Sequence, residues 1–366
     1  MDKPIRILNV FGELNRGGAE TFVMNVYRNL DKQRIQFDFL VHSESEGTFE
    51  KEIIQNGGKI YRVPNLSIKN IFIYLKDLDA FFAEHSEYSI IHNHLSETGL
   101  FVMRSAKKSG IKSRICHAHS VSSGINSKTF VRFIMKKFIR CYSTINLACS
   151  AEAGKWLYGK NSYKIIHNGI DFNMFVYLEE NRNKIREELN ITNKFVIGHV
   201  GRFVLQKNHI FLINVFEKIK KENDDAMLVL IGEGVLLDRI KEIVQQKQLE
   251  NSVIYLGSLQ NVNQYYSAFD VFVFPSKYEG LGISLIEAQV SGLPCFASNT
   301  VSKETCISKK IYYLPILKKS ISEWGNRILS FDMKQTRDRE DLLDFAYEYD
   351  IKKVVLELEK LYFSIL

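Results

Sequence analysis

The sequence predicts an α/β protein made of two doubly wound parallel sheets with helices on their faces. Its 366 residues exceed what one hydrophobic core usually serves. Short apolar runs alternate with longer amphipathic segments from one end to the other, which is the pattern of βα units. An Asn-Gly turn signal at 168–169 interrupts this alternation near the middle. We therefore expect two domains that join near residue 170 and bind a ligand in the cleft between them.

The apolar runs locate the strands, and the periodic segments between them locate the helices. Strands are expected at Ile5–Phe11, Phe37–Val41, Ile90–His92, Ser113–His117, Thr144–Ala148, Tyr163–Ile166, Phe195–Val200, Met227–Ile231, Val253–Leu256, Val271–Phe274 and Pro294–Ala297. Helical patterns include Ala19–Leu30, Ile71–Ala83, Glu97–Ser109 and Tyr349–Leu366. We expect domains at 1–170 and 171–348, with the terminal helix 349–366 packing back on the first.

Composition narrows the class of protein. A hydrophobic content of 45% and a charged content of 25% are those of a folded globular chain. No run of about 18 apolar residues is present, and the apolar stretch beside Lys3 and Arg6 at the N-terminus is too short for a signal peptide, so we expect a cytoplasmic protein. The cysteines form no CxxC pair and are expected to be reduced thiols: Cys116, Cys141, Cys149, Cys295 and Cys306.

The positive charge is concentrated in the first half. Residues 1–170 hold 24 Lys and Arg against 15 Asp and Glu, whereas the remainder holds 25 against 27. This asymmetry indicates an anionic partner for the first half, such as a membrane surface, a phosphorylated lipid or a nucleic acid. We do not expect nucleic acid, because the aromatic residues form no recognisable binding module.

A basic amphipathic segment at 128–140 suits a membrane surface. Its cations are Lys128, Arg132, Lys136, Lys137 and Arg140, its apolar residues include Phe130, Phe133 and Phe138, and Arg104, Lys107, Lys108, Lys112 and Arg114 lie nearby in sequence. Two interpretations stay open. The segment docks on an anionic bilayer, or its apolar face packs on the core and its charges are solvated.

The first loop, Gly12 to Glu20, joins a strand to a helix and contains Gly17 and Gly18. Glycines there let backbone N–H groups approach a phosphate or a sugar at a helix N-terminus. The spacing does not fit the GxGxxG dinucleotide fingerprint. A tight turn without a ligand remains the alternative.

Cationic side chains follow the first strand of the second half. Arg202 comes directly after this strand, and Lys207 precedes the next helix. Arg can grip a diphosphate with its planar fork, and Lys supplies a compact charge. Exposed surface cations are the alternative.

Two glutamates eight positions apart, Glu279 and Glu287, flank the turn Gly280–Gly282. Glu287 lies in an otherwise apolar helix start, and a buried carboxylate needs hydrogen-bond donors, which ribose hydroxyls would supply. The turn offers backbone amides to a phosphate or to sugar hydroxyls. Otherwise the two glutamates cap and brace the helix.

Histidines recur in His-x-His pairs, which suggests a zinc site: His92, His94, His117 and His119. No Cys or carboxylate pattern completes such a site, so we expect no metal. The two-residue period of a strand places His117 and His119 on one side of the backbone, although a structural histidine at a strand end stays possible. The DxD letters of Asp77 and Asp79 fall inside a helical pattern and predict a solvated helix face.

Taken in order, these motifs resemble family 4 of the GT-B glycosyltransferases, especially the bacterial capsule and exopolysaccharide enzymes. The resemblance runs nearly end to end. It comprises GGAE at 17–20, His-x-His at 117–119, HNGID at 167–171, the GR…KN pair, the glycine loop at 230–234, and the E-x7-E element at 279–287. It implies two Rossmann-like domains facing a central cleft, with acceptor binding in the first and donor binding in the second.

The resemblance also implies roles. Arg202 and Lys207 would neutralise the donor diphosphate, and Glu287 would hold the ribose. Glu279 with Gly280, Leu281 and Gly282 would hold the donor sugar, and Gly17 and Gly18 would close over the phosphates. His119 would contact the sugar near the reacting carbon. His117 stands where the family more often has a small residue or Thr, so the division of roles between the two histidines stays open.

The implied activity is a retaining, metal-independent transfer of a hexosyl group from a nucleotide-diphosphate sugar, with UDP preferred. The implied acceptor is a saccharide, lipid-linked, in capsular or exopolysaccharide biosynthesis, and the enzyme would sit in the cytoplasm or peripherally on the inner face of the membrane. No cofactor is implied. Front-side displacement and double displacement through Glu279 both stay open, as do a nucleotide-sugar hydrolase or epimerase and a non-catalytic binding subunit.

Overall fold

The computed structural model describes residues 3–67, 69–119, 129–331, 337 and 339–366. The chain divides into two compact units. Unit 1 contains residues 1–170 and 348–366, and unit 2 contains residues 171–347.

Unit 1 is built on a parallel sheet of seven strands in the order β3-β2-β1-β4-β5-β6-β7. The strands are β1 (Ile5–Phe11), β2 (Ile35–Val41), β3 (Ile60–Arg62), β4 (Ile90–Asn93), β5 (Ser113–Ala118), β6 (Ile145–Ala148) and β7 (Lys164–Ile165). The strand order reverses between β1 and β4, which pair directly. In open parallel sheets a ligand binds at the carboxyl ends of the strands beside such a reversal.

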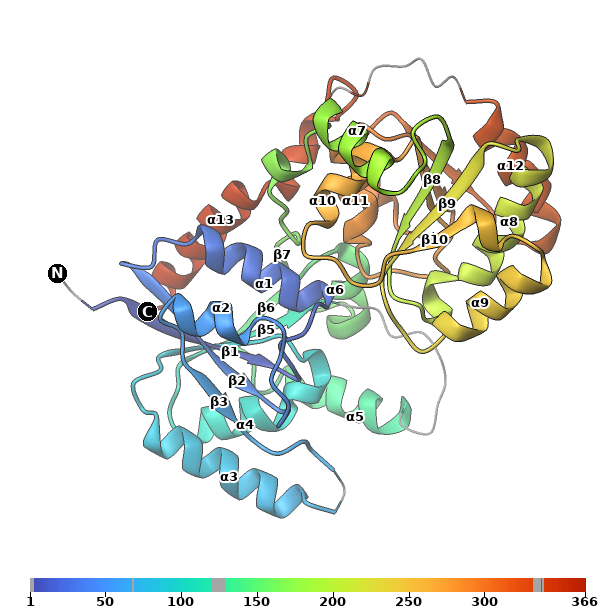
Figure 1. Cartoon of the computed structure of the whole chain (residues 1–366). Helices are drawn as coiled ribbons and strands as arrows, with labels where there is room; N and C mark the ends of the chain where they lie inside the picture. Colours follow the sequence, from blue (N-terminus) through green and yellow to red (C-terminus); the bar gives the residue numbers. More distant parts are fainter. Residues whose placement is uncertain (1–2, 68, 120–128, 332–336, 338) are drawn as a thin grey trace. The chain divides into compact units, whose positions relative to one another are not determined.

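Helices cover both faces of this sheet (Figure 1). They are α1 (Gly18–Asn29), α2 (Glu50–Gln55), α3 (Ile71–Glu84), α4 (Leu100–Lys108), α5 (Thr129–Ile139), α6 (Ala151–Tyr158) and α13 (Ile351–Ser364), with a 3-10 turn η1 (Ser96–Gly99). The main core of unit 1 lies between the sheet and α1, α2 and α13. Val354, Leu358 and Tyr362 of α13 are buried in it, so the end of the chain completes the first unit.

Unit 2 repeats the plan with six parallel strands in the order β10-β9-β8-β11-β12-β13. The strands are β8 (Phe195–Val200), β9 (Ala226–Ile231), β10 (Val253–Tyr255), β11 (Val271–Phe274), β12 (Cys295–Ser298) and β13 (Ile311–Leu314). Here the order reverses between β8 and β11. The carboxyl ends of these two strands are therefore the expected ligand position in this unit.

The helices of unit 2 are α7 (Glu179–Glu188), α8 (His209–Glu222), α9 (Leu237–Gln246), α10 (Val262–Ala268), α11 (Ile283–Val290) and α12 (Ile321–Leu329). Apolar residues of α8, α9 and α12, including Phe216, Val244 and Trp324, form one core with the sheet. The helices α7, α10 and α11 lie on the other side of the sheet in Figure 1.

The α/β fold predicted from the sequence is confirmed, and every expected strand overlaps an observed one. The prediction missed β3 and β13. Asp77 and Asp79 lie within α3, where Asp79 forms an ion pair with Lys108. The five cysteines are unpaired.

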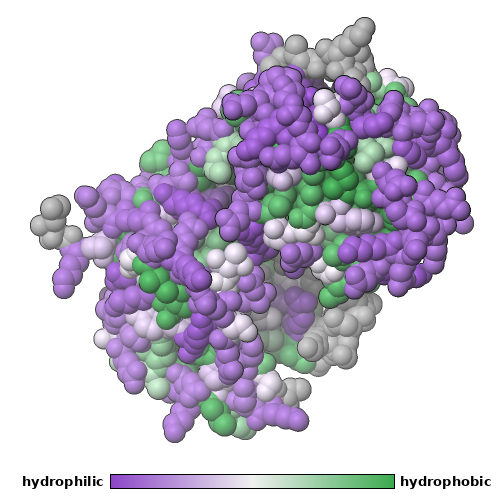
Figure 2. All heavy atoms as spheres, viewed as in Figure 1, coloured by the Kyte–Doolittle hydropathy of each residue, from purple (hydrophilic) through white to green (hydrophobic). Residues whose placement is uncertain are grey.

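The surface in Figure 2 is mostly hydrophilic, with apolar side chains in small groups. Among the described residues, no helix is both long enough and apolar enough to cross a bilayer.

Candidate active site

A buried ion pair joins Lys207 and Glu279 at the strand reversal of unit 2. Lys207 ends a 3-10 turn (Leu205–Lys207) that follows β8, and Glu279 lies in the loop between β11 and α11. Their Nζ and Oε1 atoms are 2.7 Å apart, with 14% of the lysine side chain and 7% of the glutamate side chain exposed. Gln206 Nε2 donates to the second oxygen, Oε2, at 3.1 Å. Both carboxylate oxygens are therefore occupied.

Local packing explains why the lysine reaches this position. A Cβ at Gly201 would lie 3.2 Å from Lys207 Cδ, so the glycine after β8 leaves room for the lysine stem. The ammonium group lies 4.8 Å from the ring centroid of Phe274, the last residue of β11. An aromatic face at this range attracts the cation and leaves its remaining N–H groups available to an anion.

Glu287 lies half-buried in α11, and Tyr266 Oη donates to its Oε2 at 2.6 Å. Burial raises the pKa of Glu287 to about 7, against the lowering effects of the Tyr266 hydrogen bond and of the Lys207 charge. The charge of Lys207 therefore acts on both glutamates, through an ion pair with Glu279 and over a longer distance on Glu287. At neutral pH this carboxyl group exchanges readily between its acid and its carboxylate form.

The glycine turn before α11 has a conformation that a side chain would disfavour. Gly282 is the N-cap of α11 and adopts φ +76°, in the left-handed region. A Cβ there would also approach the Phe274 ring at 3.2 Å. Leu281 is buried. The predicted turn of Gly280–Gly282 thus leads into a helix start, and the positive end of the helix dipole there favours negative charge.

Arg202 follows β8 and is exposed. In the part of the chain that the structure describes, its guanidinium has no ion-pair partner. The structure therefore brings together Lys207, Glu279 and Glu287, but it does not join Arg202 to them through a contact.

In unit 1, Gly17 and Gly18 form the start of α1. Gly17 is the extended N-cap and Gly18 the first helical residue. A Cβ at Gly17 would lie 2.2 Å from Glu20 Oε2, so the glycine allows the Glu20 side chain to fold over the helix start. Phe22 of α1 contacts the rings of His117 and His119, each at 5.5 Å between centroids. The glycine loop and the histidines thus belong to one region of unit 1.

The four histidines form one cluster on the α1 and α13 face of the sheet. His92 Nε2 lies 3.2 Å from His117 Nδ1, and His94 Nδ1 lies 2.8 Å from His119 Nε2. Burial lowers the pKa of all four imidazoles, that of His119 to about 3. The cluster is therefore uncharged at neutral pH.

The nitrogen positions in this cluster do not fit a zinc ion without movement of the rings. One ring nitrogen from each of His92, His94 and His117 lies within 4.8 Å of the other two. Tetrahedral coordination with bonds of about 2.1 Å needs ligand nitrogens about 3.4 Å apart. The rings would have to move together before one ion could contact all three, and they hydrogen-bond in pairs across β4 and β5 instead.

Sequence reasoning did not assign four residues that contact these groups. Gln206 binds Glu279, Tyr266 binds Glu287, Tyr362 Oη lies 2.8 Å from His92 Nδ1, and Asn9 Oδ1 lies 3.2 Å from His94 Nε2. Asn9 carried a signal, because it is a polar residue in the middle of an apolar run. Nothing in the sequence distinguishes Tyr266 and Tyr362 from other tyrosines, since buried tyrosines are common.

The basic segment presents apolar side chains to solvent. Met135 and Ile139 of α5 are buried, whereas Val131, Phe133 and Phe138 are 54%, 65% and 49% exposed. Lys128 and the side chain of Phe130, which the prediction included, lie outside the described residues. The exposure of these apolar residues argues against the interpretation in which the whole apolar face packs on the core.

One basic residue was assigned wrongly to this surface. Arg114 is buried, and its guanidinium donates to the backbone carbonyls of Lys112 and Tyr142. Its position in β5 turns the side chain inward, where main-chain oxygens satisfy it. Arg114 is therefore a structural residue.

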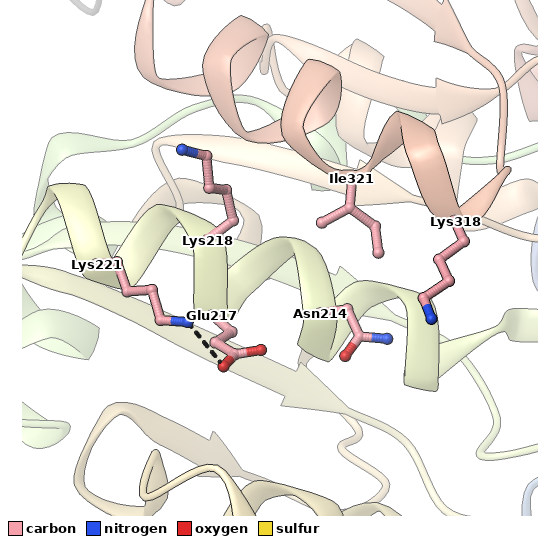
Figure 3. Close-up of a pocket in the computed structure, with 6 residues that line it drawn as sticks. All are labelled: Asn214, Glu217, Lys218, Lys221, Lys318 and Ile321. Carbon is pink, nitrogen blue, oxygen red and sulfur yellow. Dashed lines mark hydrogen bonds and ion pairs between the residues drawn. The ribbon is translucent and has the colours of Figure 1, made fainter.

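A separate pocket of about 260 Å³ lies on unit 2, between α8 and the start of α12 (Figure 3). None of the predicted site residues lines it. Its lining residues are Asn214, Glu217, Lys218, Lys221, Lys318 and Ile321.

Two family models match the chain. The model of Glycosyltransferase Family 4 matches residues 16–173, and that of Glycosyl transferases group 1 matches residues 181–310. EpsF of Bacillus subtilis, named as a glycosyltransferase, is 33% identical over 332 residues, which cover 88% of this chain and 86% of EpsF.

Two further relatives have more specific names. The capsular polysaccharide biosynthesis glycosyltransferase CapH of Staphylococcus aureus is 24% identical over 373 residues, covering 98% of this chain and 99% of CapH. The UDP-Gal:alpha-D-GlcNAc-diphosphoundecaprenol alpha-1,3-galactosyltransferase of Escherichia coli is 26% identical over 292 residues, covering 75% and 74%.

Among solved structures, Anabaena HepE in complex with UDP and glucose has a TM-score of 0.83 at 17% identity, covering 98% of this chain and 100% of HepE. This likeness concerns the fold. Together with the family models and the EpsF match, it shows that the chain is a glycosyltransferase that belongs to family 4 of the GT-B enzymes, the group of the bacterial capsular and exopolysaccharide glycosyltransferases.

Proposed function

We propose that the chain transfers a hexosyl group from a UDP-sugar to a lipid-linked saccharide, with retention of anomeric configuration and without a metal ion, in capsular or exopolysaccharide biosynthesis. The observation that carries this proposal is the cluster of Lys207, Glu279 and Glu287 at the strand reversal of unit 2. Two similar proteins support the choice of substrates. HepE was solved in complex with UDP, and the E. coli relative is named for UDP-Gal and a diphosphoundecaprenol acceptor.

In this proposal Lys207 keeps its contact with Glu279 and uses its remaining N–H groups to bind the donor diphosphate. Arg202, which is exposed and has no ion-pair partner among the described residues, adds a second positive charge. Fixed cations at the leaving group stabilise the negative charge that develops as the glycosidic bond breaks, by about 3 kcal/mol for a well-placed group. Glu287 accepts hydrogen bonds from the ribose in its carboxylate form, and Gly17 and Gly18 approach the phosphates.

Occupation of both Glu279 oxygens favours front-side displacement over a double displacement. A nucleophilic carboxylate would have to break its contact with Lys207 or with Gln206. In the front-side reaction the acceptor hydroxyl oxygen bonds to the anomeric carbon on the face from which UDP leaves. The electron pair of the breaking C–O bond goes to the diphosphate oxygen, and this oxygen takes the hydroxyl proton.

A donor screen tests the activity. Purified protein is incubated in EDTA with UDP-, GDP- or ADP-sugars and a short-chain lipid diphosphate saccharide, and nucleotide release and product are measured. We expect UDP release that depends on the acceptor. We also expect a product whose new glycosidic bond has the same anomeric configuration as the donor sugar. Nucleotide release that is independent of acceptor indicates a hydrolase, and activity that needs added metal contradicts the proposal.

Variants test the site assignment. Lys207→Ala and Arg202→Ala should lower kcat, because they remove charge that acts on the leaving group. Glu287→Ala should mainly raise KM for the donor. Arg239→Ala, an exposed residue of α9, serves as the control. Unchanged kinetics in all three site variants would contradict the assignment.

We also propose that α5 docks the enzyme on an anionic bilayer. Phe133 and Phe138 project from the same helix as the exposed cation Lys137. Lys107 of α4 adds a cation nearby, because its Nζ donates to the backbone oxygen of Cys141, just after α5. Exposed aromatic and basic residues on one helix combine apolar insertion with attraction to anionic lipid.

Vesicle sedimentation tests this docking. The wild-type protein should sediment with phosphatidylglycerol vesicles and much less with phosphatidylcholine vesicles. Phe133→Ser/Lys137→Glu should abolish the difference. The matched control is Leu317→Ser/Lys319→Glu, a pair of exposed residues on unit 2 with the same chemistry. Equal binding of both double variants would contradict the docking role of α5.

A further inference from the structure

Two hydrogen-bonded lines of side chains run across the strand ends of unit 1. In the first, Asn9 Oδ1 contacts His94 Nε2 at 3.2 Å, and His94 Nδ1 contacts His119 Nε2 at 2.8 Å. In the second, Tyr362 Oη contacts His92 Nδ1, and His92 Nε2 contacts His117 Nδ1. The lines differ at their outer ends, because an amide oxygen only accepts hydrogen bonds whereas a tyrosine hydroxyl donates or accepts.

The first line determines which nitrogen of His119 carries its proton. Asn9 Nδ2 donates to Ile7 O, and this contact turns Asn9 Oδ1 toward His94. A neutral imidazole has one N–H and one bare nitrogen. His94 must therefore donate through Nε2 to Asn9, and its bare Nδ1 accepts from His119 Nε2–H. His119 Nδ1 is then left bare. The second line imposes no such order on His117.

The bare nitrogen has no partner in the described residues. His119 Nδ1 is shielded from solvent and makes no hydrogen bond, and the same is true of Asn168 Oδ1. Burial lowers the pKa of His119, and the side chain of Asn168 raises it, because Asn168 can accept a hydrogen bond from the protonated imidazole. An unsatisfied buried acceptor costs about 1–3 kcal/mol. Two such acceptors side by side lack hydrogen-bond donors, and the hydroxyl groups of a sugar are donors.

Packing fixes the line in place. The ring of His94 stacks on Phe11 with 4.5 Å between centroids, and Asn9 is fully buried in β1. The line therefore has little freedom to exchange partners, and it presents one defined acceptor at the end of β5.

We propose that Asn9 and His94 are positioning residues that hold His119 as its Nε2–H tautomer, so that His119 Nδ1 and Asn168 Oδ1 accept hydrogen bonds from hydroxyl groups of the donor hexose. The tautomer follows from unit 1 alone. The identity of the ligand rests on the proposed function, so the two parts are tested by separate measurements.

The first measurement is a long-range ¹H–¹⁵N spectrum of the full chain labelled in histidine, with His119 assigned by its loss in His119→Gln. We expect a protonated Nε2 and a bare Nδ1. Asn9→Leu should abolish this preference and give a mixture of tautomers. Tyr362→Phe is the matched control, because it cuts the second line in the same cluster and should leave His119 unchanged. A wild-type His119 protonated at Nδ1, or one unaffected by Asn9→Leu, overturns the proposal.

The second measurement concerns the ligand. UDP-glucose and UDP-galactose should shift the His119 Nδ1 signal through hydroxyl donation, and UDP, which lacks the hexose, should not. Asn9→Leu and Asn168→Leu should lower kcat/KM for the donor sugar tenfold to a hundredfold while changing the Kd for UDP less than twofold. An equal loss of UDP affinity would indicate a structural role and overturn the positioning role. The expected tautomer together with no transfer from any donor supports the positioning line and contradicts the proposed function.

Discussion

The substitution Glu287→Gln should stabilise unit 2, and the stabilisation should grow as the pH rises from 4.5 to 7. Burial raises the pKa of this carboxyl group from its ordinary value of 4.5 to about 7, a difference of about 2.5, and each pKa unit corresponds to about 1.4 kcal/mol. Ionisation therefore costs the folded protein about 3.5 kcal/mol once the pH exceeds 7. Glutamine keeps an oxygen that accepts from Tyr266 and never ionises.

The sign follows from proton binding. Because the folded pKa is above the unfolded one, the folded wild type holds the proton more tightly between pH 4.5 and 7 and loses stability as the pH rises through this range. The free energy of unfolding of Glu287→Gln should equal that of the wild type at pH 4. The difference between them should then grow by up to about 1.4 kcal/mol per pH unit and level off above pH 7.

Urea unfolding at pH 5, 6, 7 and 8 measures this difference. The chain has two tryptophans, Trp156 in unit 1 and the fully buried Trp324 in unit 2, so a Trp156→Phe background reports on unit 2 alone. Glu323→Gln, at an exposed position of α12, is the control and should show no trend. The same Glu287→Gln variant should bind UDP at least tenfold more weakly at pH 8. A stability difference that is flat from pH 5 to 8 would refute the reasoning.

Three further substitutions are expected to have measurable effects. Lys207→Met leaves the carboxylate of Glu279 buried without its cation and should destabilise unit 2 by about 3–5 kcal/mol, as measured by urea unfolding. The double variant Lys207→Met/Glu279→Gln should recover most of this loss. A double variant as unstable as the single one would contradict the pairing. Gly282→Ala should cost about 1–2 kcal/mol because φ is +76° at this position, as measured by the same method. Ser150→Ala removes the side-chain cap of α6 and should cost unit 1 about 1 kcal/mol, read from Trp156 fluorescence.

The strands were predictable because both sheets are covered on their two faces, so their strands read as apolar runs. The two strands that were missed are short edge strands. β3 has three residues, none of them fully buried, and only Leu314 of β13 is buried. With one neighbouring strand each, they are stabilised by pairing more than by burial, and pairing leaves little trace in the sequence.

The site was predictable as a set of residue types but not as a set of contacts. Lys207 and Glu279 were assigned separate roles, and their ion pair spans 72 positions. It exists because β8 and β11 are neighbours in the sheet, which depends on the order of all six strands. The lines through Asn9 and Tyr362 likewise depend on side chains from β1 and α13 that share no local pattern with the histidines.

The position of α13 bears on the order in which the protein is completed during synthesis. The chain leaves unit 1 at Ile170 and returns at Glu348, and Ile170 N donates to Tyr349 O at 2.9 Å. Unit 2 is therefore an insertion in unit 1. During synthesis the ribosome completes unit 2 before it has made the last helix of unit 1. Unit 2 can therefore finish folding before unit 1, whereas domains usually fold in order from the N-terminus. A nascent chain that ends before residue 350 would leave the apolar face around Phe37 open to chaperones and proteases.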